Sequence, residues 1–191
     1  IGVESGSPRI LRMISKDETV ETALEANRKL AGFPIVPLYF FMMGFPTETP
    51  EELGQSISLA LQLLRENPNA DVSFNIYTPY PGTPLYHEAV ERGLPAPGSL
   101  DEWSRVSFRR PPPENAHVPP ETAALIRGLD FPLMFLGTRF SPRAYRSINR
   151  FAKLAGSVYR PIAMYRVKRM NARFPLETML AKALGLFARD A

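Results

Sequence analysis

The sequence of 191 residues contains no cysteine and only two histidines. It therefore has no disulfide, no thiolate metal site and no cysteine nucleophile. His87 and His117 fall in an expected helix and an expected linker without neighbouring ligand residues, so we give neither a metal or acid–base role. We assign no catalytic residue and no metal ligand to this chain.

A long uninterrupted hydrophobic run is also missing. Residues 30–47 carry no charge, but Pro34, Pro37 and Pro46 break the run, so a buried strand with its loops explains it better than a spanning helix. The chain opens at Ile1 with no signal-peptide pattern. We expect a cut through a longer, cytoplasmic protein, of globular composition with 45% hydrophobic residues.

Residues 1–95 alternate strand and helix signals. Strands are expected at 1–3, at 35–43 with both faces covered, and at 71–77. Helix starts are expected at Ser7-Pro8, in a capping box at Thr49 and at Thr83-Pro84, and Gly32 ends a further helix. Three strand–loop–helix units predict parallel strands with right-handed crossovers.

The second half of the chain has a different character. Residues 96–120 are rich in proline and are expected to form a linker, which Trp103 and Phe108 anchor to the body. Residues 121–191 are expected to form a basic helical region without strands.

In parallel α/β folds, ligands bind where strands end and helices begin. Residues 2–7, 43–49 and 78–84 are such junctions, and neighbouring strands would bring them to one rim. Glu4 would then present a carboxylate at this rim, and Lys16 would return to it. Each also has an ordinary interpretation, Glu4 as a helix cap or solvated side chain and Lys16 as a surface lysine near a helix C-terminus.

Together these junctions resemble the radical S-adenosylmethionine (radical SAM) superfamily. The matching segments are residues 1–7 (IGVESGS) with 13–16 (MISK), 43–49 (MGFPTET) and 77–86 (YTPYPGTPLY). Their order and spacing resemble the second half of a partial (βα)6 barrel, a TIM-like α/β fold, followed here by an all-α extension. Residues 159–163 and 173–177 are similar to tails in the branch with a cobalamin-binding domain.

The resemblance implies a site for S-adenosylmethionine (SAM). Glu4 matches a residue that meets the ribose hydroxyls, Lys16 matches a cation that pairs with the methionyl carboxylate, and backbone at 43–44 and 76–78 flanks the adenosine. Phe40 stands where some members have a second ribose-binding acid, which leaves the ribose to Glu4. The implied cofactor-binding residues are Glu4, Ser5, Lys16, Met43, Gly44, Ile76 and Thr78.

The resemblance also implies a 4Fe–4S cluster, held by three cysteines that this chain lacks. With the cluster, such an enzyme cleaves SAM to a 5′-deoxyadenosyl radical that modifies a substrate. We therefore expect this chain to be inactive alone and to need the missing N-terminal half of the same protein. The expected reaction is methyltransferase-like or cyclase-like on a small-molecule or lipid-like substrate, with cobalamin if that domain lies upstream.

Charge is divided unevenly along the chain. Residues 139–191 hold 12 Lys+Arg and 2 Asp+Glu, whereas residues 1–138 hold 11 and 17. The basic region fits a solvated helical face, or a surface that lies on the inner face of an anionic membrane. Charge alone does not establish nucleic-acid binding, which we disfavour. The alternative to an enzyme is an αβ binding module whose basic tail docks on RNA or on an anionic membrane.

Overall fold

The computed structural model describes residues 1–103, 117–137 and 150–173. These residues form an α/β fold around three parallel strands in the order β1-β2-β3, as the sequence predicts. The strands are β1 (Gly2–Glu4), β2 (Leu38–Met43) and β3 (Asp71–Ile76). Within the described residues β1 and β3 form open edges, so the sheet is not seen to close into a barrel.

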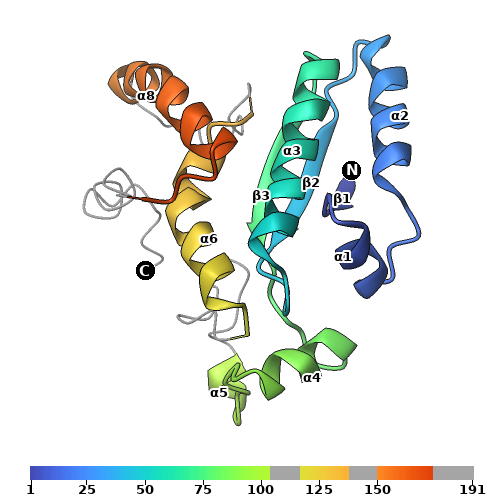
Figure 1. Cartoon of the computed structure of the whole chain (residues 1–191), viewed down its shortest axis with the longest axis vertical. Coiled ribbons are helices and arrows are strands. Elements are labelled where there is room, and N and C mark those ends of the chain that lie inside the picture. The colour runs from blue at the N-terminus through green and yellow to red at the C-terminus, as the bar shows by residue number, and fades with distance from the viewer. Residues whose placement is uncertain (104–116, 138–149, 174–191) are drawn as a thin grey trace.

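Seven helices accompany the sheet in the described parts of the chain. Helix α3 runs along one face of the sheet. Helix α2 lies on one flank of α3, and α6 and α8 lie on its opposite flank (Figure 1). Their bounds are α1 (Pro8–Met13), α2 (Val20–Ala31), α3 (Pro50–Glu66), α4 (Pro84–Glu91), α5 (Leu100–Trp103), α6 (Pro120–Leu133) and α8 (Arg150–Lys168).

The expected helix starts are confirmed at all three positions, although the third has no side-chain capping bond. Ser7 accepts a hydrogen bond from the backbone of Ile10, and Thr49 forms a capping box with Glu52. Thr83 occupies the N-cap position of α4, but its side chain accepts no capping bond; its hydroxyl donates to the carbonyl of Tyr80. Pro84, whose fixed φ suits the first helical position, begins that helix.

The expectation that residues 35–43 are covered on both faces is wrong for the described structure. Burial alternates along β2: Tyr39, Phe41 and Met43 are fully buried, whereas Phe40 is 40% exposed. Successive side chains of a strand point to opposite faces, and α3 covers only one of them. Leu38 and Met42 lie on the uncovered face with Phe40.

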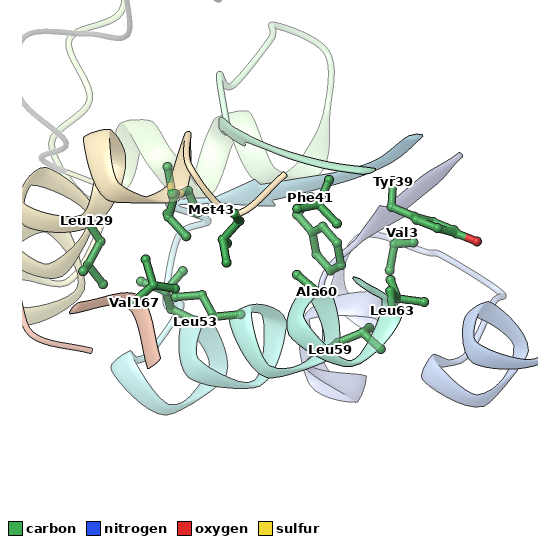
Figure 2. Close-up of a cluster of buried hydrophobic side chains, with 14 of the residues drawn as sticks. Val3, Tyr39, Phe41, Met43, Leu53, Leu59, Ala60, Leu63, Leu129 and Val167 are labelled. Carbon is green, nitrogen blue, oxygen red and sulfur yellow. The ribbon is translucent and has the colours of Figure 1, made fainter. Parts of the chain in front are cut away.

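One hydrophobic core joins the sheet to both halves of the chain. Figure 2 shows the buried side chains of β2 directed toward α3, with Leu129 of α6 and Val167 of α8 extending the same cluster. Trp103, an expected anchor, is half-buried with its ring 6.1 Å from that of Tyr86 in α4. Phe108, the other, lies outside the described residues.

Candidate functional site

The three strand-to-helix junctions lie side by side at one edge of the sheet. Arg9 joins the first two: its Nη2 donates to Glu52 Oε2 at 2.6 Å and to the carbonyl of Thr47 at 2.9 Å. The second and third are joined by the rings of Phe45 and Tyr77, which stack with centroids 4.8 Å apart. The sequence-based expectation that these junctions share a rim is therefore confirmed.

The side chains of Glu4 and Lys16 both approach Gly2, on the face of the sheet that α3 does not cover. Val3 is buried in the core, so its neighbour Gly2 faces the other way. A Cβ atom at Gly2 would overlap the Glu4 carboxylate and lie 3.7 Å from Lys16 Nζ. The left-handed φ of Ser15, 56°, turns the chain after α1 so that Lys16 reaches this point.

The two side chains differ in their partners. Glu4 Oε2 is enclosed and has no hydrogen-bond partner among the described residues. Lys16 Nζ lies 3.5 Å from Glu18 Oε2, and its side chain is 27% exposed. An enclosed carboxylate oxygen without a donor is costly, so a ligand with hydroxyl donors would stabilise it. This pair is the part of the rim best suited to bind a polar ligand.

Ser5 faces the protein interior. Its side chain is fully buried, and Ser5 Oγ lies 3.1 Å from Ser56 Oγ of α3. The same Ser56 hydroxyl accepts the backbone N–H of Gly6 at 2.9 Å. The Ser5 hydroxyl is therefore engaged in holding β1 against α3.

The remaining expected cofactor residues form the ends of β2 and β3. Met43 is fully buried, and its carbonyl accepts the backbone N–H of Tyr77 at 2.8 Å. Ile76 packs against the edge of the core. Gly44 has a φ of +87°, which glycine adopts without strain. Thr78 is nearly buried, and its Oγ1 has no hydrogen-bond partner among the described residues.

Glu48 is a site residue that the sequence analysis did not single out. It is fully buried, and burial raises its pKa to about 7, although hydrogen bonds from the Gly44 and Phe45 backbone oppose the shift. Its Oε2 accepts the Gly44 N–H at 2.6 Å, whereas Oε1 has no partner in the described structure. Its position directly after Gly44-Phe45-Pro46 is the feature of the sequence that could have marked Glu48 as a site residue. The sequence does not show that Glu48 is buried, because this burial depends on distant residues.

Those distant residues come from the start of α6. Thr122 Oγ1 donates to the carbonyl of Glu48 at 2.6 Å, and Val118 lies against Gly44. His117 is also buried, and burial lowers its pKa while the nearby Gly44 backbone opposes this shift. Neither ring nitrogen makes a hydrogen bond of good geometry with a described residue. His117, which we expected in a linker without a role, thus packs under the second rim loop.

A second candidate site in the described structure borders this rim only at Gly6. A surface hollow of about 480 Å³ is bounded by α3, by Val20 of α2 and by Lys168 and Met170 at the end of α8. None of the seven expected cofactor residues lines it. No group of three or more His, Asp or Glu residues within the described ranges is arranged to hold a metal ion.

The chain is similar to part of several larger proteins. It is 39% identical over 94 residues to a Pyrococcus horikoshii protein described as an uncharacterized methyltransferase. This match covers 49% of the chain and 19% of that relative. It is 40% identical over 85 residues to the tRNA-2-methylthio-N(6)-dimethylallyladenosine synthase of Baumannia cicadellinicola, covering 43% of the chain and 18% of the relative. A third relative is an uncharacterized protein of Methanocaldococcus jannaschii, to which the chain is 35% identical over 86 residues. This match covers 44% of the chain and 19% of the relative.

The matched stretch thus spans less than a fifth of the length of these relatives. No protein-family model matches the chain. The similarity is distant and partial, and two of these three relatives carry the names of transferase-type enzymes.

Proposed function

We propose that this chain is part of a radical SAM enzyme and supplies the portion of its SAM site that holds the ribose and the methionyl carboxylate. The observation that carries the proposal is that the side chains of Glu4 and Lys16 both lie close to Gly2, at the carboxyl edge of a parallel sheet. The enclosed Glu4 Oε2 would accept ribose hydroxyl donors, and the Lys16 ammonium would pair with a carboxylate. Gly2 leaves room for the Glu4 carboxylate.

A 4Fe–4S cluster does not fit this chain, because the sequence has no thiolate to ligate it. The proposed cluster ligands, like most of the length of the relatives, lie outside these residues. SAM supplies the radical chemistry only in combination with such a cluster. Within the proposal, the chain's own residues bind and orient SAM and contribute no electron-transfer step.

The proposed reaction is transfer of a methyl-type group. The names of the relatives, a methyltransferase and a tRNA-2-methylthio-N(6)-dimethylallyladenosine synthase, support this class. The resemblance of residues 159–163 and 173–177 to tails of the cobalamin-binding branch supports cobalamin-dependent methyl transfer, with the cobalamin domain elsewhere in the complete protein.

Isothermal titration calorimetry of the 191-residue chain with SAM tests the cofactor site. A charge-assisted contact contributes about 1.5–3 kcal/mol when largely dry, so Glu4→Gln and Lys16→Met should each weaken binding by about 10- to 150-fold. Glu25→Gln and Lys29→Met are matched controls on exposed side chains and should bind SAM as the unsubstituted chain does. A folded chain that takes up no SAM would instead favour a non-enzymatic binding module, and variants that bind SAM unchanged would overturn the roles of Glu4 and Lys16.

A further inference from the structure

The outer surface of α8 combines exposed apolar side chains with uncompensated positive charge. No Asp or Glu occurs between Asp130 and Glu177, whereas ten Lys and Arg residues do. A solvated helix usually mixes both signs of charge, which form ion pairs on its surface. The described end of α8 lies in the middle of this stretch, and the charge pattern therefore favours an anionic partner.

Helix α8 has two distinct faces over its described side chains. Ala163 and Val167 are fully buried against the rest of the protein. Arg166 is also buried, and it donates to the carbonyls of Gly128, Asn171 and Arg173. This inner face fastens the end of α8 to the body, so Arg166 belongs to the fold and is not available to a partner.

The opposite face carries Val158, Ile162 and Tyr165, exposed by 68%, 54% and 60% respectively. Spacings of four and three residues place them in one stripe along the helix. Lys168 and Arg169 are exposed beside this stripe. In Figure 1 this helix lies at the periphery of the molecule, with α6 between it and the sheet.

We propose that this stripe and its flanking cations dock α8 on an anionic lipid bilayer, with the helix lying in the plane of the interface. Apolar side chains in a row gain free energy by entering the lipid, while Lys and Arg remain at the headgroups. Tyr165 adds a ring of the kind that prefers the interface. No described helix is long and apolar enough to cross a membrane, so an in-plane position is the one that suits α8.

Lipid explains the surface better than nucleic acid does. Phosphate backbones attract the cations, but they offer no apolar phase for Val158 and Ile162. Both partners would respond to the loss of Lys168 and Arg169, whereas only a bilayer requires the apolar stripe. The two can therefore be separated by substituting the apolar and the basic residues independently.

The test is flotation of the chain with vesicles of phosphatidylcholine alone or mixed with phosphatidylglycerol. We expect binding to the mixed vesicles and little to the neutral ones, with weakening at high salt. Lys168→Gln with Arg169→Gln should weaken binding about 25-fold, since each cation near an anionic surface contributes about fivefold. Arg12→Gln with Lys29→Gln, on exposed positions of the body, is the matched control and should have a much smaller effect.

The decisive variant replaces Val158, Ile162 and Tyr165 together by Gln. It keeps every charge and uses a good helix former at exposed positions, so circular dichroism should show an unchanged fold. We expect about a tenfold or larger loss of vesicle binding, whereas Leu100→Gln with Met134→Gln, also exposed and apolar, should bind normally. Undiminished binding of the triple variant, no retention on anionic vesicles, or retention on an RNA hairpin without vesicle binding would each overturn the proposal.

Discussion

Glu48 accepts the backbone N–H of Gly44 at 2.6 Å, so a buried carboxylate supports the loop that follows β2. The hydrogen bond fixes the left-handed turn at Gly44, and the Thr122 hydroxyl holds the Glu48 backbone from the other side. Helix α6, in the C-terminal half of the chain, therefore supports the same rim as the strands.

Glu48 should make the protein less stable as the pH rises. Its folded pKa of about 7 exceeds the ordinary 4.5, so the folded state binds more protons between these values. Its contribution to the free energy of unfolding should fall by up to about 3 kcal/mol from pH 4.5 to 7 and then level off. Denaturant titrations at several pH values should show this slope in the difference between the unsubstituted protein and Glu48→Gln. An identical slope in the variant would contradict the assignment.

His117 should act in the opposite pH direction. Burial lowers its folded pKa below the ordinary 6.5, so the unfolded state binds more protons below that value. Stability should consequently fall as the pH drops below 6.5, and His117→Gln should flatten this acid limb in the same titrations. His87→Gln, at a helix position for which we expect no role, is the control and should leave the acid limb intact. If both variants or neither variant lost the fall in stability below pH 6.5, this fall could not be assigned to His117.

The Arg9–Glu52 ion pair should stabilise the rim at neutral pH. The Arg9 guanidinium lowers the Glu52 pKa to about 2, so the stabilisation is present above pH 4.5 and is lost as the pH falls toward 2. Arg9→Gln should cost about 1–2 kcal/mol at pH 7, because half-exposed Arg9 is screened by water. Thermal unfolding of Arg28→Gln, which breaks a more exposed pair with Glu66, should show a smaller loss. Equal losses would mean that the Arg9–Glu52 pair stabilises the protein no more than the more exposed Arg28–Glu66 pair.

Gly6 should tolerate no side chain. A Cβ there would lie 2.5 Å from the carbonyl oxygen of Gln55, in the backbone of α3, which cannot move aside as a flexible side chain does. Gly6→Ala should destabilise the protein by about 1–3 kcal/mol in denaturant unfolding. Gly32→Ala, where the nearest atom is 3.6 Å away, should change stability by less than about 0.5 kcal/mol. A neutral Gly6→Ala would show that β1 and α3 are not closely packed.

Local chemistry made much of the fold predictable. Ser7 and Thr49 cap helices in the ways their side chains favour, and the apolar run before Gly44 marks a strand. The sequence could not show which face of β2 is covered, because Phe40 and Phe41 are equally apolar. The sequence also could not show that Glu48 is buried, because this burial involves a contact with Thr122, 74 residues further along the chain.

The shared core limits how this chain can be divided. Ile126, Leu129 and Val167 are buried with the side chains of β2 and α3, so a protein ending at residue 95 would expose their contact surface to water. Such a newly wetted apolar layer favours self-association. The sheet and the described C-terminal helices should therefore unfold as one cooperative unit. Replacing either part by the corresponding part of another protein would disrupt the packing of both.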